Sequence, residues 1–510
     1  MGKTFYVTTP IYYVNDVPHI GHAYTTVAAD TIARYRRLMG DRVYFLTGTD
    51  EHGQKIERAA ESAGETPIEL ADRVVVRFQK LWELLGITNS DFIRTTQQRH
   101  KASVSEIFRR IEARGDIYLG EYEGWYNVRE EAFVTDSQME EIMAMPESAR
   151  PTLDRVKEES YFFRLSKFQE PLLEYYEKNP GFIEPSYRRN EVMRFVEGGL
   201  KDLSVSRTTF SWGIPVPGNP KHVIYVWFDA LTNYLTAPGF PDDEARLGEI
   251  WPADIHLVGK DILRFHAVYW PAFLMSAGIP LPKKVFAHGW WTVDGEKMSK
   301  SLGNVVDPYK IVDEFGADAF RYFLLREIPF GQDGDFSRDA LIRRINGELA
   351  NGLGNLVSRT LGMIERYSAG KVPVPAAPYT DEDETVKRGA VEAAKALETA
   401  MQEVAFHKAL FAIWDYIALV NRYVDDTAPW TLKKEGRAER LDTVLYVLAE
   451  SLRIIVTMTY PFIPYSSEQV WLRLGRRDEL SAQLLKDVRQ WGLSEPGALV
   501  TKGESLFPRV

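Results

Sequence analysis

Apolar and polar positions alternate with two different periods at the start of the chain. Residues 4–8 form a short β-rich run, residues 23–39 carry apolar side chains at helical spacing, and residues 43–46 form a second β-rich run. Gly40 separates the helical pattern from the second run. A strand, a helix and a strand in this order predict a β-α-β unit. Residues 1–115 therefore read as the first half of a doubly wound α/β sheet.

The pattern changes in the next stretch, and the α/β pattern resumes near residue 204. Residues 118–133 and 157–165 are aromatic-rich strand candidates in a loop-rich region. Residues 223–230 read as a buried strand that ends in polar residues, and residues 255–261 repeat this scheme with a strand, a glycine and charges. We expect the second half of the sheet here.

The last third of the chain has a purely helical pattern. A Pro- and Ala-rich hinge at residues 371–378 divides it, and residues 496–510 are irregular. Long helical segments with short connections predict an α-helical bundle, and we expect the irregular tail to pack back on the body. The predicted helical segments are residues 346–364, 381–406, 409–424 and 440–474.

Composition excludes several classes of protein. The 510 residues, 45% hydrophobic and 26% charged, are typical of a soluble globular protein with more than one domain. No window approaches the roughly 20 uninterrupted apolar residues of a membrane helix. No secretory leader precedes the first strand, so we expect a cytoplasmic protein with no membrane partner.

Cysteine content and charge restrict the chemistry further. The chain has no cysteine, which excludes disulfides, thiolate catalysis and cysteine-ligated metals. Its net charge of −10 (62 − 72) argues against an indiscriminate nucleic-acid binder, whose affinity comes from bulk positive charge. An RNA partner would need local basic patches or stacked bases on this acidic body.

Two histidines and a glycine stand where the first loop meets the first helix. Residues 18–22 read Pro-His-Ile-Gly-His. A helix N-terminus offers free backbone N–H groups and a positive dipole end, so it suits an anion such as phosphate. His19 and His22 share a helical face, and Gly21 lets a flat ring or a phosphate approach the backbone. Taken alone, such a pair is more often a matter of capping, packing or chance than a binding site.

Acidic residues follow two of the predicted strands. Ligands of doubly wound folds collect at the carboxyl ends of the strands. Asp50 follows the second β-rich run and is well placed to hold a substrate ammonium, although it could also cap a helix. Asp261 follows Gly259 at the end of a later strand and suits a pair of ribose hydroxyls. Ile262 and His266, four apart, share one helical face.

Two lysines stand in a loop flanked by glycines. Residues 297–301 read Lys-Met-Ser-Lys-Ser, with Gly295 before them and Gly303 after them. A lysine pair alone is typical of a solvated surface. Together with His-Ile-Gly-His, however, this stretch resembles the paired signatures of class I aminoacyl-tRNA synthetases.

The nearest resemblance is to the methionyl-tRNA synthetase family, and it covers essentially all 510 residues. It rests on residues 9–15, 18–22, 49–53, 225–230, 259–262, 297–301, 355–359 and 428–430. It implies an α/β fold with a doubly wound Rossmann-type catalytic domain, split by a connective insertion and followed by an all-α helical-bundle anticodon-binding domain. The implied divisions are the first half of the catalytic domain (1–115), the insertion with a metal-free knuckle (116–203), the second half (204–290), the lysine-loop connector (291–345) and the anticodon-binding domain with its tail (346–510).

The resemblance also implies a reaction. L-Methionine is activated with ATP to methionyl-adenylate and pyrophosphate, and the methionyl group then passes to the 3′ end of tRNA(Met), including the initiator. A carboxylate is already a nucleophile, so attack on the α-phosphorus needs no general base, and catalysis is mostly positioning and charge stabilisation. The implied catalytic residues are His19, His22, Lys297 and Lys300, with Mg²⁺ carried by ATP.

Three binding sites follow from the same resemblance. The implied ATP-binding residues are Gly21, Gly259, Asp261, His288, Lys297, Ser299 and Lys300. The implied methionine-binding residues are Ile11, Tyr13, Asp50, Trp227, Tyr234, Ile262 and His266. The implied anticodon-binding residues are Asn355, Arg359, Pro429 and Trp430. Aromatic rings suit a thioether, since sulfur–ring contacts contribute roughly 0.3–1.5 kcal/mol.

The insertion departs from the family pattern. In methionyl-tRNA synthetases it commonly carries a zinc knuckle with Cys or His ligands. The corresponding positions hold Asn127, Glu130, Met145 and Ser148, which cannot make a tetrahedral nitrogen/sulfur site. We therefore expect no structural zinc and a knuckle held together by packing.

Other interpretations are open at this point. Leucyl, isoleucyl and valyl enzymes carry a large editing domain, for which residues 115–225 look too short, and cysteinyl enzymes need a zinc-bound cysteine. A small-molecule nucleotidylyltransferase would not account for the helical third. The intact histidines and lysines oppose a catalytically silent RNA-binding relative. The family's C-terminal dimerisation module is not seen after the bundle, so we expect a monomer.

Overall fold

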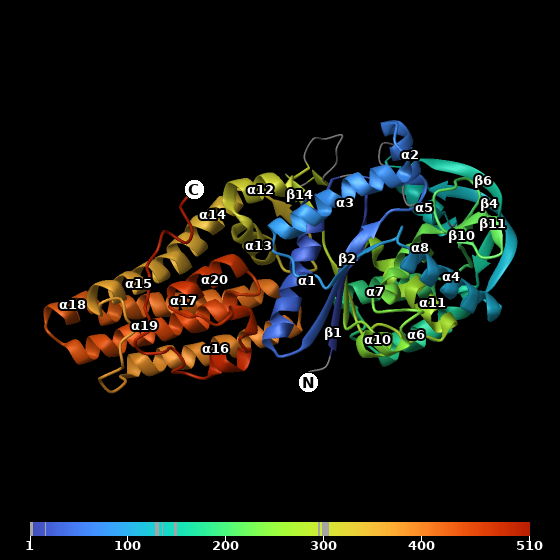
Figure 1. Ribbon diagram of the computed structural model, residues 1–510. Coiled ribbons are helices and arrows are strands. Elements are labelled where there is room, and N and C mark those ends of the chain that lie inside the picture. Colours follow the sequence, from blue (N-terminus) through green and yellow to red (C-terminus); the bar gives the residue numbers. More distant parts are fainter. Residues whose placement is uncertain are drawn as a thin grey trace.

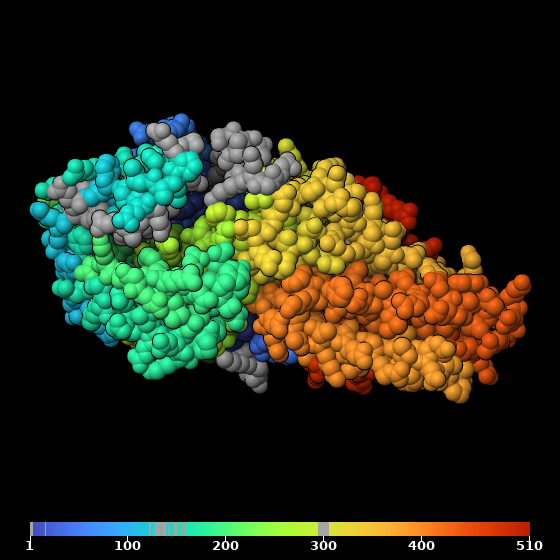
Figure 2. All heavy atoms as spheres, turned by 180° about the vertical axis from the view of Figure 1, so that it is seen from behind, coloured from blue at the N-terminus to red at the C-terminus, as the bar shows by residue number. Residues whose placement is uncertain are grey.

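The computed structural model describes residues 4–15, 17–127, 132–134, 136–146, 150–293, 296–297 and 305–510. An α/β part and a helical part lie end to end, with the helical part extending from one end of the body (Figures 1 and 2). This arrangement confirms the predicted fold class. No helix in these ranges is both long enough and apolar enough to cross a membrane.

A parallel sheet forms the centre of the α/β part. Within the described residues it has six strands, in the order β3 (Asp91–Arg94), β2 (Arg42–Asp50), β1 (Thr4–Tyr13), β12 (Ile255–Gly259), β13 (Val285–His288) and β7 (Ile183–Glu184). Helix α1 (Ile20–Leu38) connects β1 to β2, which confirms the predicted β-α-β unit. The direction of strand addition reverses between β1 and β12. In doubly wound folds, ligands bind in the crevice outside the carboxyl ends of the strands at such a point.

Both faces of the sheet are covered by helices. Tyr6 and Val7, neighbours on β1, belong to different apolar cores because successive strand residues point to opposite faces. The core on the Val7 face continues into the helical part, so the two parts of the molecule share it. Besides α1, the helices of this part include α2 (Gln54–Ala63), α3 (Pro67–Leu84), α4 (Gln98–Ala113), α6 (Gln169–Lys178), α7 (Ser186–Glu197), α10 (Glu244–Ile250) and α11 (Trp270–Ala277).

The inserted segment is built on a long antiparallel pair. Strands β4 (Ile117–Asn127) and β6 (Leu153–Phe163) pair along their whole length, which confirms both strand predictions in this region. The segment also contains β5 (Ala132–Phe133), α5 (Asp136–Ala144), the 3-10 turn η2 (Leu165–Phe168) and β8 (Leu203–Ser204). Strand β7, which lies between η2 and β8 in the chain, pairs with β13. The inserted segment therefore supplies an edge strand to the main sheet.

The knuckle positions are only partly described. Asn127 is buried and Met145 is exposed, whereas Glu130 and Ser148 lie outside the described residues. Among the residues that are described, no group of three or more His, Cys, Asp or Glu side chains is placed to hold a metal ion. The expectation of a zinc-free protein stays a prediction.

The strand predicted at residues 223–230 is wrong in its second half. Strand β11 (Asn219–Ile224), which pairs with β9 (Ser206–Arg207) and β10 (Pro215–Val216), ends before helix α8 (Val226–Leu231) begins. Helix α9 (Asn233–Thr236) follows directly. A short apolar run reads alike as a buried strand or a buried helix, because neither has a polar face.

Two further connections complete the α/β part. The 3-10 turn η3 (Lys260–Ile262) and the π-helical turn η4 (Phe265–Tyr269) lead from β12 into α11. After β13 come β14 (Trp291–Val293) and β15 (Glu296–Lys297), and β16 (Gly334–Phe336) pairs with β14. Helices α12 (Pro308–Phe315), α13 (Ala317–Arg326) and α14 (Arg338–Arg344) form the connector. Residues 298–304, most of the lysine loop, lie outside the described ranges.

The helical part confirms the predicted bundle. Its helices are the π-helix η6 (Ile345–Gly354), α15 (Asn355–Tyr367), α16 (Asp381–Gln402), α17 (Phe406–Thr427), α18 (Pro429–Lys434), α19 (Ala438–Thr459) and α20 (Pro464–Arg473), followed by the 3-10 turns η7 (Leu480–Ala482) and η8 (Leu485–Arg489). The tail packs back as expected, since the Val372 N–H donates to the Ala498 carbonyl and Phe507 is buried.

A buried arginine joins the two parts. The Arg321 guanidinium on α13 donates to the carbonyls of Leu85, Pro461 and Phe462, each at 3.0 Å. It also forms an ion pair of 2.8 Å with Asp30 on α1. Helix α1, which His19 caps, is thus fixed to the α19–α20 turn of the bundle.

Candidate functional site

His19 and His22 form the cap of helix α1. The Nδ1 atom of His19 accepts a hydrogen bond from the Gly21 N–H, and the Nδ1 atom of His22 accepts one from the His19 N–H, both at 3.1 Å. The two rings stack with their centroids 3.8 Å apart. A Cβ atom on Gly21 would lie 2.9 Å from the His19 ring, so the stacked arrangement requires glycine there.

This cap decides which atoms the two imidazoles can offer. Because each Nδ1 accepts from a backbone N–H, the ring proton lies on Nε2 in both histidines. Burial, together with the neighbouring His19, holds the pKa of His22 well below its usual value, so this ring is neutral at physiological pH. The result is a pair of Nε2–H donors at the positive end of a helix, an arrangement suited to phosphate oxygens.

The nucleotide side of the crevice lies at the ends of β12 and β13. A Cβ atom on Gly259 would lie 2.6 Å from the Asp261 carboxylate, so glycine allows that carboxylate to fold back over the strand end. His288 is buried, and its Nδ1–H donates to the Gly289 carbonyl at 2.8 Å. Its Nε2 therefore accepts from the Thr25 hydroxyl at 2.6 Å. His288 thus supports the first turns of α1.

Trp290 is a residue that the sequence analysis did not select. Its indole N–H donates to Asp261 at 3.0 Å, and the Lys260 ammonium lies 4.1 Å from its ring centroid. Lys260 in turn pairs with Asp333 at 2.5 Å, directly before β16. Trp290 follows His288 by two residues, but only the folded chain brings its indole to Asp261.

The predicted amino-acid pocket contains a fixed hydrogen-bond chain. The His266 Nδ1–H donates to the Ile262 carbonyl at 2.9 Å, so His266 Nε2 accepts from the Tyr234 hydroxyl at 2.8 Å. Burial lowers the pKa of His266 to about 4, which keeps its ring uncharged at neutral pH. Tyr234 and His266 therefore present a neutral, fully oriented wall.

Aromatic rings from separate elements form another wall. Trp227 on α8 stacks on Phe265 with centroids 3.7 Å apart and planes at 8°. Phe265 is a second residue that the sequence analysis did not select. Ile11, Tyr13 and Ile262 pack with Trp227 against the same apolar core that contains Tyr234.

Asp50 completes the pocket residues. It is the last residue of β2, is buried, and stands beside Tyr13 in the pairing of β1 with β2. The structure thus brings the predicted methionine-binding residues to the carboxyl edge of the sheet, from β1, β2, α8, α9 and the η3–η4 segment.

The predicted anticodon-binding residues lie together in the bundle. Trp430 is 46% exposed, and the Arg359 guanidinium lies 5.8 Å from its ring centroid. Arg359 also forms an ion pair of 2.6 Å with Asp425. Asn355, one turn earlier on α15, is exposed. Pro429 is buried and begins α18 directly after Ala428.

The lysine loop is the least described of the predicted sites. Lys297 ends β15, and its backbone pairs with Thr292 on β14. Ser299 and Lys300 lie outside the described residues. The short sheet of β14, β15 and β16 fixes where the loop starts.

Comparisons with known proteins agree along the whole chain. A family model described as tRNA synthetases class I (M) matches residues 5–151 and 146–361, and one described as the anticodon-binding domain of tRNA ligase matches residues 384–502. The methionine–tRNA ligase of Caldanaerobacter subterraneus subsp. tengcongensis is 52% identical over 100% of this chain and 79% of that protein. The methionine–tRNA ligase of Rickettsia felis is 50% identical over 100% of this chain and 99% of that protein.

A solved structure extends the likeness to three dimensions. The Mycobacterium tuberculosis methionyl-tRNA synthetase in complex with methionyl-adenylate has a TM-score of 0.95 and 46% identity, over 99% of this chain and 100% of that one. These matches, together with the histidine cap and the aromatic pocket, show that the chain belongs to the methionyl-tRNA synthetase family of class I aminoacyl-tRNA synthetases.

Proposed function

We propose that this protein is a methionine–tRNA ligase. It activates L-methionine with ATP to methionyl-adenylate and pyrophosphate, then transfers the methionyl group to the 3′ end of tRNA(Met), including the initiator. The observation that carries this proposal is the fold shared at a TM-score of 0.95 with a synthetase solved in complex with methionyl-adenylate.

Activation rests on positioned donors. The methionine carboxylate attacks the α-phosphorus of ATP and pyrophosphate leaves, so negative charge moves onto the phosphate oxygens. The Nε2–H groups of His19 and His22 are oriented before substrate arrives, because the backbone fixes both rings. Lys297 and Lys300 neutralise the departing pyrophosphate together with the Mg²⁺ that ATP carries.

The nucleotide is held by residues on both sides of the crevice. Gly21 and Gly259 leave room for the His19 ring and the Asp261 carboxylate and lie against the phosphates and the ribose. Asp261 accepts from ribose hydroxyls, and His288 supports the helix that carries the donors. The remaining proposed contacts, from the lysine loop, are Lys297, Ser299 and Lys300.

Selection of methionine rests on a carboxylate and a neutral aromatic wall. Asp50 holds the substrate ammonium. Trp227, Tyr234 and His266 surround the thioether, and Ile11, Tyr13 and Ile262 complete the pocket. An uncharged His266 matters here, because a charged imidazolium would favour water or an anion over sulfur.

The bundle recognises the tRNA anticodon. Trp430 stacks on an unpaired base while Asn355 and Arg359 bind polar base edges, and Pro429 fixes the start of the helix that carries the indole. The same proposal includes the domain divisions 1–115, 116–203, 204–290, 291–345 and 346–510. It also includes a monomeric protein of the cytoplasm without structural zinc.

The test is ATP–pyrophosphate exchange with each of the twenty amino acids. We expect methionine to give by far the fastest exchange. Equal or faster exchange with leucine, isoleucine or valine contradicts the proposed specificity. Lys300→Ala should lower the exchange rate far more than it weakens methionine binding, because its charge is needed as pyrophosphate departs. A variant that only raises the KM shows that this role is wrong.

A further inference from the structure

A fully buried carboxylate lies behind the proposed methionine pocket. Asp229 belongs to α8, and its two oxygens accept from two different histidines. Oδ2 accepts from His52 Nδ1 and Oδ1 accepts from His100 Nε2, both at 2.7 Å. Both imidazoles are buried as well. None of these three residues belongs to the proposed substrate contacts.

The carboxylate joins the segments that carry the pocket. His52 follows Asp50 by two residues at the end of β2. Trp227 precedes Asp229 by two residues on α8, and this spacing places the two side chains about 200° apart around the helix. Trp227 can therefore face the substrate while Asp229 faces the protein interior.

The second histidine fixes the next helix. His100 lies on α4, and its Nδ1 atom is 3.2 Å from the Thr236 hydroxyl on α9. Thr236 follows Tyr234 by two residues, so His100 holds the element that carries the pocket tyrosine. Through one carboxylate, the end of β2, α8 and α4 are locked together.

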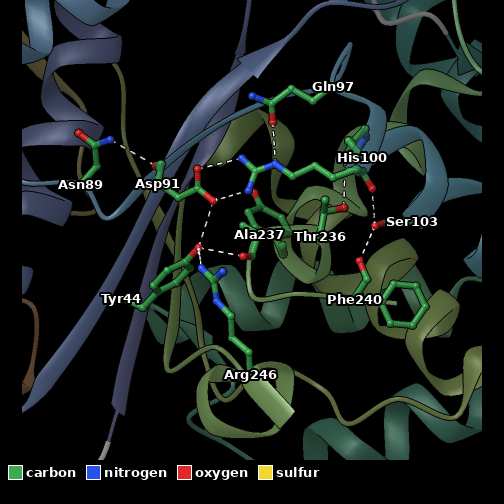
Figure 3. Close-up of polar contacts among 12 residues, drawn as sticks. Tyr44, Asn89, Asp91, Gln97, His100, Ser103, Thr236, Ala237, Phe240 and Arg246 are labelled. Atoms are coloured by element: carbon green, nitrogen blue, oxygen red, sulfur yellow. Dashed lines mark hydrogen bonds and ion pairs between the residues drawn. The ribbon is translucent and has the colours of Figure 1, made fainter. Parts of the chain in front are cut away.

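A second layer of polar contacts holds α4 itself in place (Figure 3). Asp91 on β3 makes a two-pronged ion pair with Arg99, at 2.7 and 2.9 Å. Ser103 donates to the Phe240 carbonyl at 2.6 Å, and Tyr44 donates to the Ala237 carbonyl at 2.9 Å. These contacts clamp the chain after α9 against α4 and the sheet edge, so His100 has little freedom to move.

Only an ionised acid fits at position 229. Burial by itself opposes ionisation, but His52 and His100 outweigh it and lower the pKa of Asp229 to about 2. A carboxylate can accept from both imidazoles at once, whereas an amide of the same size presents one acceptor and one donor. Asparagine would therefore face one of the two histidine N–H groups with its own N–H.

We propose that Asp229 is a positioning residue for the methionine pocket, acting through His52 and His100 to hold Asp50, Trp227 and Tyr234 at their mutual distances. This proposal rests on the proposed function. In this proposal, specificity for methionine depends on Asp229, a residue that does not contact the substrate. Displacement of binding groups by about 1 Å costs up to ~100-fold in enzymatic efficiency, so a small shift of α8 is sufficient for a large effect.

The test is steady-state ATP–pyrophosphate exchange with Asp229→Asn. We expect the KM for methionine to rise about 10- to 100-fold while the KM for ATP stays within about twofold, because the nucleotide residues lie on other elements. Asp383→Asn is the matched control. Asp383 is equally buried and accepts from Tyr423 and Arg440, but it lies in the bundle. The control should lower the melting temperature without changing either KM.

The histidines give a second test that does not depend on that variant folding. His52→Asn and His100→Gln each keep an N–H donor near the position of the lost one, whereas His52→Leu and His100→Leu remove it. We expect the leucine variants to raise the KM for methionine and the amide variants to restore most of it.

Two results overturn the proposal. One is an unchanged KM for methionine in Asp229→Asn, or in both leucine variants, together with a lower melting temperature, which would make the cluster purely structural. The other is a parallel rise of both KM values. Failure of the proposed function gives a different result, because the unmodified protein would then show no preference for methionine.

Discussion

Polar and aromatic side chains of the proposed sites are buried at the catalytic end of the molecule and exposed at the anticodon-binding end. At the crevice, Tyr234 and His266 are 1% and 2% exposed, and their hydrogen bonds are complete before substrate arrives. In the bundle, Trp430 is 46% exposed and Arg359 pairs with an exposed Asp425. Chemistry on a small molecule benefits from dipoles that need no reorganisation, whereas an unpaired RNA base needs an open ring face on which to stack.

The two ends nevertheless share one frame. Helix α1 carries the histidine cap at its start and Asp30 farther along, and Asp30 binds Arg34 and Arg321 at 2.8 Å each. Arg321 reaches the α19–α20 turn of the bundle. A buried ion cluster of this kind fixes geometry strongly, because removing one partner leaves another charge buried and unpaired.

The largest expected effect lies at the crevice, in the histidine cap. In His22→Asn the shorter amide can still accept from the His19 N–H, but it loses the Nε2–H donor. We expect the rate of methionine activation to fall about 10²- to 10³-fold with an unchanged melting temperature, since one preorganised donor is removed. His22→Gln retains a donor at that distance and should keep more activity than His22→Asn. Equal exchange rates in both variants would mean that His22 only caps the helix.

The second-largest expected effect is on tRNA aminoacylation and lies in the helical bundle. Trp430→Ala should lower the efficiency of tRNA aminoacylation by about one to two orders of magnitude, because base–aromatic stacking contributes roughly 1–3 kcal/mol. Methionine activation and the melting temperature should stay nearly unchanged, since Trp430 is 46% exposed and lies in the bundle. Parallel loss of both activities with a lower melting temperature would show that Trp430 is a core residue and would end the contrast between the two ends.

The shared frame predicts an acid-labile contribution to stability. Burial opposes ionisation of Asp30, but Arg34 and Arg321 lower its pKa to about 2, below the value of about 3.9 in an unfolded chain. This lowering of the pKa of Asp30 stabilises the folded protein by roughly 2–3 kcal/mol. The contribution is fully present above pH ~5 and is lost progressively as the pH falls toward ~2. Urea unfolding of the unmodified protein and of Asp30→Asn at pH 7, 4 and 3 measures it. The difference between them should shrink as the pH falls, and a constant difference would contradict this assignment.

The smallest expected effect concerns the insertion, where removal of zinc should leave the activity unchanged. The purified protein should contain no stoichiometric zinc and should keep its activity in strong chelator once Mg²⁺ is restored. The reason is the absence of Cys and His at Asn127, Glu130, Met145 and Ser148. One equivalent of tightly held zinc by elemental analysis would refute this prediction.

The sequence by itself determined the local features. The β-α-β unit, the helical bundle and the position of the histidine pair at a helix start all follow from residues close together in the chain, because periodicity and capping are local properties. Family resemblance then named the pocket residues.

Only the tertiary structure decided which residues support that pocket. Residues 226–231 form a helix although their apolar run also suits a strand, because a fully buried segment has no polar face to show its period. Phe265 reaches Trp227, Trp290 reaches Asp261, and the short strand β7 joins a distant sheet edge, all through contacts that no local pattern encodes. The carboxylate of Asp229 meets histidines 177 and 129 residues away in the chain. Such pairings are fixed only when burial forces every polar atom to find a partner.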